Sequence, residues 1–274
     1  MPKRRRLPLQ KLDPEGVGMK EAERLVSFRG KDVLEVGCGN GRLTFQYAPI
    51  AKRVVAIDPS AKAISEARRN TPKELASRIS FRVGRGEGLA FPDEAFDLAF
   101  FSWSLCCTDV PVQGRALMEA WRVLRRNGIL LNVQESLHQP FYSGMITYIL
   151  KRNSGQPDWT EPEREARLAL RHASLVERKF DYVAERELPV FNYYETVREA
   201  LRDVTTKNGL KYADLSQETR RGLLNILDSL RTRKGVRIQV NSVMTVLRKR
   251  CADRVSRGNE YGKRERRNQR ALPR

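Results

Sequence analysis

Histidine and cysteine are scarce in this sequence. Its 274 residues include two histidines and four cysteines, and no two cysteines form a C-x-x-C pair. A disulfide scaffold and a structural zinc site both need more of these residues at closer spacing, so neither is expected and no metal site is predicted. The same scarcity fits a reducing compartment, and we expect a cytoplasmic protein.

Long apolar runs are also missing. The longest apolar stretches, such as residues 129–133, have the length of a β-strand and fall far short of the roughly 18 residues that predict a membrane span. The first ten residues, MPKRRRLPLQ, are basic but have no apolar segment behind them. Neither a secretory signal nor a membrane span is therefore expected.

Acidic residues are too few to balance the basic ones. With 52 Lys and Arg against 33 Asp and Glu, the formal net charge is +19. Residues 1–11 carry +5 and residues 248–274 carry +8, and the latter stretch has a single aromatic residue. Such segments cannot bury enough apolar surface to fold alone. We expect a disordered basic arm at residues 1–12 and a disordered basic tail at 249–274. These ends either aid solubility or bind phosphate groups.

Between these ends the composition is that of a globular protein. Over the whole chain, 40% of the residues are hydrophobic and 31% are charged, which excludes collagen-like, coiled-coil and fully disordered chains. We find no internal repeat and no linker long enough to force a second independent domain. One domain is therefore expected over residues 13–248.

The first half of the chain alternates between short apolar runs and helical patterns. Near-continuous apolar runs of this length predict parallel strands buried on both faces. Helices are predicted at 60–69, capped by Ser60, and at 111–126, where Asn127 and Gly128 would stop the helix. This alternation predicts a doubly wound α/β sheet. The apolar runs lie at residues 33–36, 54–57, 79–83, 96–101 and 129–133.

The second half has a different pattern. A helical insertion is expected at 136–178, followed by a strand over about 179–190. Helix patterns come next at 194–208 and 217–233, and a last strand is expected near 237–247.

A turn rich in glycine follows the first strand. Residues 33–44 read VLEVGCGNGRLT, so a strand enters a turn with glycines at alternate positions and a helix follows. Glycines serve where the backbone turns sharply or lies against a ligand, and the N–H groups of the following helix favour an anion. The dinucleotide fingerprint G-x-G-x-x-G would need glycine where Arg42 stands, and no G-K-[ST] follows, which excludes a P-loop.

An acid at the end of the second strand supports a nucleotide site. Asp58 lies 21 residues after Gly37, in the segment AIDPS. A carboxylate at this place can accept hydrogen bonds from both hydroxyls of a ribose. The glycine turn and this acid together are a far more specific signal than either alone.

These motifs resemble class I S-adenosylmethionine-dependent methyltransferases, in particular the type 11 family. The G-x-G-x-G turn is similar to the family's first motif, and the resemblance extends to GRGEGLAFPD at 84–93, to E-x-x-R-V-L at 119–124 and to Gly128. It covers about residues 30–135. It implies a Rossmann-like, doubly wound mixed sheet of about seven strands, with helices on both faces and a helical lid insertion. Residues 30–135 would form the cofactor-binding core, 136–235 the lid and C-terminal elements, and 236–248 the last strand.

The resemblance also implies where S-adenosylmethionine binds. The segment after the third strand would line the adenine, and the segment after the fourth would border the methyl group. Arg85 departs from the family, which commonly has an acid there, so the adenine contact would pass to Glu87 or to the backbone near Gly86. The expected cofactor-binding residues are Glu35, Gly37, Cys38, Gly39, Gly41, Asp58, Pro59, Gly86, Glu87, Ser102 and Trp103.

Few side chains point to a catalytic role. His138 and Tyr142 are candidates for a general base, although surface or packing roles suit them as well. The adjacent Cys106 and Cys107 suggest a thiol nucleophile, but the Pro-Cys of cytosine-C5 methyltransferases is missing, and buried packing thiols are far commoner.

Three functions remain open from the sequence. The first is methyl transfer to a small-molecule acceptor. The second is an RNA or ribosome-associated methyltransferase that docks through its basic ends. The third is a non-catalytic protein that binds the cofactor. The identity of the acceptor and the oligomeric state cannot be read from the residues.

Overall fold

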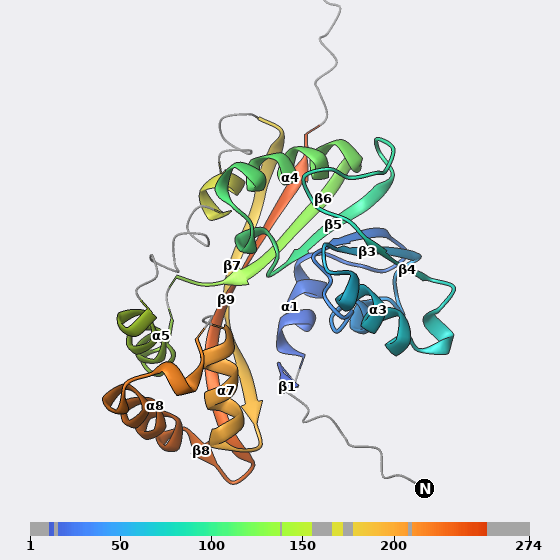
Figure 1. The fold of residues 1–274 in the computed structure, drawn as a ribbon. Coiled ribbons are helices and arrows are strands. Elements are labelled where there is room, and N and C mark those ends of the chain that lie inside the picture. The colour runs from blue at the N-terminus through green and yellow to red at the C-terminus, as the bar shows by residue number, and fades with distance from the viewer. Residues whose placement is uncertain are drawn as a thin grey trace, which may run out of the picture.

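The computed structural model describes residues 11–13, 16–137, 139–154, 166–171, 178–207 and 210–250. These residues form one mixed sheet with helices on both faces (Figure 1). The strand order is β1-β7-β9-β6-β5-β2-β3-β4, and β8 pairs with β9. The strands are β1 (Lys11–Leu12), β2 (Asp32–Val36), β3 (Arg53–Asp58), β4 (Ile79–Val83), β5 (Phe96–Ser102), β6 (Leu124–Glu135), β7 (Phe180–Tyr194), β8 (Arg231–Thr232) and β9 (Gly235–Lys249).

Helices connect most of these strands. Short 3-10 helices lie at Lys73–Leu75, Leu105–Cys107 and Tyr212–Asp214, and residues 166–171 are also helical. None of the helices in the described ranges has the length and apolar character needed to cross a membrane. The α-helices are α1 (Val17–Leu25), α2 (Thr44–Tyr47), α3 (Ala61–Asn70), α4 (Val110–Val123), α5 (Phe141–Ser154), α7 (Val197–Lys207) and α8 (Gln217–Ser229).

The expected doubly wound sheet is confirmed. The five apolar runs of the first half are strands β2 to β6, and the two strands expected in the second half are β7 and β9. The remaining two strands, β1 and β8, have two residues each. Strands β4, β3, β2, β5 and β6 are parallel to one another, whereas β9 is antiparallel to both β6 and β7. The carboxyl ends of the parallel strands therefore meet at one edge, which is where ligands bind in open α/β sheets.

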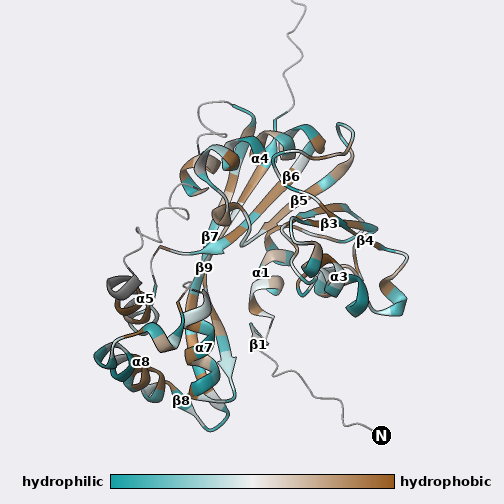
Figure 2. Ribbon diagram, viewed as in Figure 1, coloured by the Kyte–Doolittle hydropathy of each residue, from teal (hydrophilic) through white to brown (hydrophobic). Residues whose placement is uncertain are grey.

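Apolar clusters cover both faces of the sheet. Ala22 of α1 and Ile64 of α3 belong to a cluster on one face, and Leu117 of α4 belongs to a cluster on the other. Figure 2 shows the central strands as predominantly hydrophobic and the outer surfaces of the helices as hydrophilic. Because the central strands are buried on both faces, their sequences are near-continuous apolar runs, and the strands can be predicted from these runs.

The predicted end of the helix over 111–126 is wrong. Helix α4 ends at Val123, and Leu124 already belongs to β6. The backbone N–H groups of Glu94 and Ala95 donate to the carbonyls of Arg122 and Val123, which satisfies the helix end and aligns the chain with the sheet. The expected stop at Asn127, which has a φ of +58°, lies inside the strand instead.

Two other predicted helices are shorter than expected. The helix predicted at 194–208 begins at Val197, because Tyr194 pairs with Val236 as the last residue of β7. The helix predicted at 217–233 ends at Ser229, since Arg231 and Thr232 pair with the start of β9. Pairing with distant strands overrides the local helical pattern in both places.

Lys11 and Leu12, at the end of the expected basic arm, pair with β7 as β1.

Strands β7 and β9 extend beyond the rest of the sheet. The pairing of β9 with β6 ends at Ser242, whereas its pairing with β7 continues to Val236. Helices α5, α7 and α8 pack beside this extension around their own apolar cluster, which contains Ile146, Leu201 and Leu227. We call these three helices and the extension the second lobe (Figure 1). Its three helices lie within residues 136–235, the range expected to hold the lid and C-terminal elements.

Candidate functional site

The glycine turn lies at the carboxyl end of β2. The backbone N–H groups of Gly37 and Cys38 both donate to the carbonyl of Ile57 in β3, at 2.8 and 3.0 Å. Gly37, Gly39 and Gly41 have φ values of +80°, +56° and +81°. Residues other than glycine rarely adopt this left-handed backbone conformation, so the turn strongly favours glycine at these three positions.

Space around these glycines assigns them different roles. A Cβ at Gly37 would lie 2.2 Å from the Cβ of Ser104, and a Cβ at Gly41 would lie 2.8 Å from the ring of Phe81. A Cβ at Gly39 would meet nothing within 4 Å. Gly37 and Gly41 therefore permit close packing within the protein, whereas Gly39 faces open space where a ligand can lie against the backbone.

Asp58 connects the glycine turn to the end of β3. Its Oδ2 accepts a hydrogen bond from the backbone N–H of Gly39, and its Oδ1 accepts one from the N–H of Ser60, both at 2.8 Å. A carboxylate can accept about four hydrogen bonds. Acceptor capacity thus remains for the hydroxyls of a ribose, and the carboxylate is already oriented by the protein.

A cavity of about 290 Å³ opens beside this carboxylate. Six of the predicted cofactor residues line it: Gly37, Asp58, Pro59, Gly86, Glu87 and Trp103. Apolar side chains, including Leu105 and Ala116, form much of the remaining wall. Cavities of this size that combine apolar walls with a few polar groups are typical of small-ligand sites.

Sequence reasoning missed several residues of the cavity wall. Ser104, Leu105, Cys107 and Thr108 all follow the predicted Ser102 and Trp103, so the prediction along this loop stopped too early. Ala116 belongs to the buried face of α4, and its place at the cavity depends on how that helix packs.

The other predicted residues near the turn lie beside the cavity wall. Four of these predicted residues do not line the cavity: Cys38, Gly39, Gly41 and Ser102. Gly39 contributes through its N–H to Asp58. Trp103, with a φ of +50°, donates its N–H to the carbonyl of Val133 in β6. This bond fixes the loop at the edge where the two strands end.

Glu35 lies beneath the turn and is fully buried. Its Oε2 accepts hydrogen bonds from the hydroxyls of Thr44, at 2.5 Å, and Tyr47, at 2.8 Å. Its Oε1 has no hydrogen-bond partner within the described residues. Burial raises the pKa of Glu35 to about 7, and the two hydroxyl bonds oppose this rise. The side chain connects β2 to α2, and one buried acceptor atom remains for a cationic or N–H group.

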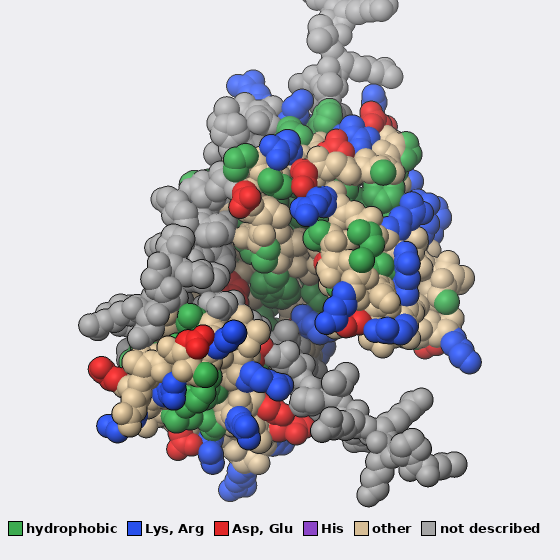
Figure 3. Space-filling view, viewed as in Figure 1, with side chains coloured by type: hydrophobic (Ala, Val, Ile, Leu, Met, Phe, Trp, Pro, Cys, Tyr) green, Lys and Arg blue, Asp and Glu red, His purple; other side chains and the backbone are tan. Residues whose placement is uncertain are grey.

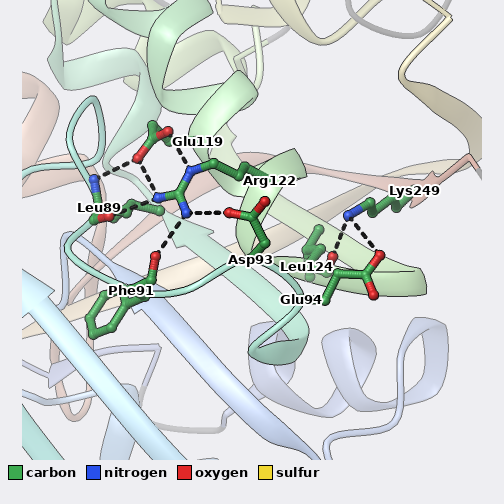
Figure 4. A network of polar contacts seen from close by, with 8 residues as sticks. All are labelled: Leu89, Phe91, Asp93, Glu94, Glu119, Arg122, Leu124 and Lys249. Carbon is green, nitrogen blue, oxygen red and sulfur yellow. Dashed lines mark hydrogen bonds and ion pairs between the residues drawn. The ribbon is translucent and has the colours of Figure 1, made fainter.

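The segment after β4 is held by a network centred on Arg122 of α4 (Figure 4). Its guanidinium donates to the carbonyls of Leu89 and Phe91, each at 2.8 Å, and pairs with Glu119 and Asp93. Glu119 also accepts the N–H of Leu89 at 2.8 Å. The E-x-x-R pair thus fastens to α4 the loop that follows Glu87. Lys249 of β9 makes a neighbouring contact with the carbonyl of Leu124.

Arg85 and Glu87 lie in the same loop, upstream of this network. Both line the cavity, and the Arg85 guanidinium is 3.7 Å from a Glu87 carboxylate oxygen. The Arg85 side chain is 72% exposed and that of Glu87 is 23% exposed. Glu87 is therefore the acceptor that this loop turns toward the cavity.

The thiols differ in their surroundings. Cys38 and Cys106 are buried, and burial raises the pKa of Cys38, which keeps its thiol protonated and unreactive. Cys107 is exposed and donates to the carbonyl of Trp103 at 3.1 Å.

The geometry bears on one of the two candidate bases, Tyr142. The side chain of Tyr142 in α5 is exposed, and it does not line the cavity. His138 lies outside the described residues. We assign no general base.

Residues 34–132 match the family model described as a methyltransferase domain of type 11. This match covers the glycine turn, Asp58, the loop after β4 and α4. Residues 34–132 thus carry a methyltransferase domain of this family.

Curated relatives of this methyltransferase domain match over similar lengths. A protein of Aspergillus luteorubrus named "Probable methyltransferase ltbC" is 36% identical over 121 residues, which are 40% of this chain and 41% of that protein. A demethylmenaquinone methyltransferase of Tropheryma whipplei is 36% identical over 129 residues, which are 45% and 51% of the two chains. The chain thus aligns with about half the length of these relatives.

Solved structures share the fold over most of the chain. The YcgJ protein of Bacillus subtilis superposes with a TM-score of 0.54 at 16% identity, covering 85% of this chain and 98% of that one. The [4+2]-cyclase SpnF superposes with a TM-score of 0.53 at 20% identity, covering 84% and 79%. At these identities the likeness concerns the fold alone, which hosts more than one chemistry.

The residues of the methyltransferase domain fit S-adenosylmethionine, the cofactor of this family. The space at Gly39, the remaining acceptor capacity of Asp58 and the apolar wall at Leu105 suit a nucleoside. The unpartnered Oε1 of Glu35 suits a positively charged or N–H group near the turn.

Proposed function

We propose that this protein transfers a methyl group from S-adenosylmethionine to a small-molecule acceptor. The observation that carries the proposal is the carboxylate of Asp58, oriented by Gly39 and Ser60 at the mouth of a cavity beside the glycine turn. The name of the demethylmenaquinone relative supports a small-molecule acceptor. We also propose a cytoplasmic site of action, because the described cysteines are free of disulfides, as is usual in a reducing compartment.

In this proposal the chain binds and orients the reactants. Asp58 accepts from the ribose hydroxyls, while the backbone at Gly86 and the side chain of Glu87 contact the adenine. The turn at Gly37, Cys38, Gly39 and Gly41 lies against the methionine end, with Glu35 beneath it.

Trp103 and Ser102 border the place where the acceptor enters. When bound, the cofactor supplies a methyl group that is already activated for nucleophilic attack. The remaining task of the protein is to hold the acceptor atom in line and to exclude water, which requires no dedicated base for many acceptors. We place the acceptor between the loop at 102–108 and the second lobe, which would act as the lid.

Labelled S-adenosylmethionine and an extract of the source cells test the proposal. After incubation with the full-length protein, label is measured separately in the small-molecule, RNA and protein fractions, with Asp58→Ala as the control. Label in small molecules that depends on Asp58 is the expected result. Label in RNA would replace the proposal by the RNA methyltransferase. Cofactor binding with no label in any fraction would favour a non-catalytic protein that binds the cofactor.

A further inference from the structure

The positive charge of the folded part of the chain is concentrated in one segment. Residues 52–85 contain nine Lys and Arg against three acidic residues, a net charge of +6. Residues 12–247 as a whole also carry +6, so the remainder of that range sums to zero. This segment spans β3, α3 and β4 at one edge of the sheet, on the opposite side from the second lobe (Figure 1).

All nine basic side chains of this segment are exposed. Lys52 and Arg53 pair with Asp32, and Arg85 lies near Glu87. The other six make no ion pair with a carboxylate in the part of the chain that the structure describes. We call these six residues the α3–β4 basic surface; they are Lys62, Arg68, Arg69, Lys73, Arg78 and Arg82.

Three of these arginines are held in place by the fold. Arg68 donates from two nitrogens to the carbonyl of Phe81, at 2.6 and 3.1 Å, so α3 is joined to β4. Arg78 donates to the carbonyl of Ala51 at 2.9 Å. Arg82 lies over the ring of Phe91, 5.7 Å from its centroid. These contacts leave the positive charge of each guanidinium unchanged. They also restrict the side chains in advance, which reduces the conformational entropy that the arginines lose when a ligand binds.

Figure 3 shows Lys and Arg side chains gathered over the side of the molecule where Figure 1 places α3 and β4. We propose that the α3–β4 basic surface binds the phosphate backbone of a nucleic acid. Guanidinium groups match the geometry of phosphate groups. A surface of Lys and Arg side chains that make no ion pair with a carboxylate is typical of proteins that bind phosphate groups.

The chemistry of the surface favours a nucleic acid over other polyanions. A protein interface is built around an apolar core, and a peripheral membrane contact inserts apolar side chains. Val83, 57% exposed, is the one large hydrophobic side chain exposed between residues 52 and 85. Protein–nucleic acid interfaces are by contrast polar and strongly positive.

This surface is separate from the proposed methyl transfer. It lies at the edge strand, and none of its six side chains lines the cavity. The proposal therefore concerns docking of a nucleic acid and does not depend on the proposed function. The sequence suggests phosphate binding only for the basic arm and tail, and the proposal extends this role to the folded domain.

Two matched triple variants of the full-length chain test this surface. Lys62→Gln, Arg69→Gln and Lys73→Gln remove three charges from exposed side chains of the surface. Lys211→Gln, Arg221→Gln and Lys234→Gln remove the same types from exposed positions on α8 and on the loops beside the second lobe. Both variants keep the basic arm and tail. Binding is measured by fluorescence anisotropy with a labelled RNA duplex and a DNA duplex of the same sequence, each of about 20 base pairs, at about 50 to 200 mM salt. Thermal melting and cofactor titration verify that each variant is folded.

The surface variant is expected to bind at least about tenfold more weakly, and its slope of log affinity against log salt to fall by about 3. The second-lobe variant should bind like the unmodified protein, and the two duplexes show which nucleic acid is preferred. Equal losses in both variants would overturn the proposal in favour of net charge. Undiminished binding in the surface variant would assign all binding to the ends. Binding to phosphatidylserine vesicles without duplex binding would replace it by a membrane contact. None of these readings depends on methyl transfer.

Discussion

The backbone N–H of Gly39 donates to the carboxylate of Asp58, so the glycine turn and the end of β3 form one unit. The acid and the glycine thus hold each other in place within the turn. Asp58→Ala removes the acceptor of two backbone N–H groups, and we expect it to lower the free energy of unfolding by about 1–2 kcal/mol. We expect the affinity for S-adenosylmethionine to fall by at least about 100-fold, because the variant loses the two charge-assisted bonds that we propose between Asp58 and the ribose.

Calorimetric titration and thermal melting measure these two effects separately. Glu74→Ala, at an exposed acid outside the cavity, is the control and should change neither. Undiminished cofactor affinity in folded Asp58→Ala protein would refute the ribose contact.

Gly37→Ala and Gly39→Ala should differ in kind. Both alanines take a left-handed conformation, which costs about 1–2 kcal/mol. Only Gly37→Ala also brings a Cβ within 2.2 Å of Ser104, so its total loss of stability should be about 3 kcal/mol or more. Gly39→Ala should stay folded and lose cofactor affinity, because its Cβ enters the open space. Denaturant unfolding and cofactor titration compare the variants, and similar losses of stability in both would contradict the assigned roles.

Glu35 should make stability fall as the pH rises. Its pKa is about 7 in the folded protein against 4.5 for an ordinary glutamate. The folded protein therefore keeps the proton over a range where the unfolded chain has lost it. The contribution of Glu35 is fully present below about pH 4.5 and is lost progressively up to about pH 7, by about 3 kcal/mol in total.

Glu35→Gln removes this titration and retains an acceptor for Thr44 and Tyr47. The free energy of unfolding, measured by urea denaturation at about pH 5 and about pH 8, should fall less in the variant than in the unmodified protein. The difference between the two proteins isolates the contribution of Glu35, because all other titrating groups are the same in both. Equal changes in both proteins would show that Glu35 is ionised throughout.

Arg122→Lys should loosen the loop after β4. Lysine cannot reproduce a guanidinium that donates to two carbonyls and pairs with two carboxylates. We expect a loss of about 2 kcal/mol in the free energy of unfolding and weaker cofactor binding, because Gly86 and Glu87 lie in this loop. Arg126→Lys, on an exposed residue nearby, is the control. Unchanged cofactor affinity with reduced stability would limit Arg122 to a structural role.

The sequence alone determined the parts whose signal is local. Short apolar runs revealed the five parallel strands β2 to β6, since burial of the central ones on both faces leaves little choice of residue type. Strand-like patterns in the second half revealed β7 and β9. Gly37, Gly39 and Gly41 revealed the turn because its left-handed backbone strongly favours glycine. Asp58 followed from its place at the end of the next strand.

Tertiary structure decided what depends on distant partners. Helix α4 ends at Val123 because the N–H groups of Glu94 and Ala95 meet its last carbonyls. Ser104 reaches the cavity because it packs on Gly37. The pKa of Glu35 depends on complete burial, and the basic surface exists because Arg68 joins α3 to the edge strand β4. Such contacts form between residues far apart in the chain, and a local pattern of residue types carries no record of them.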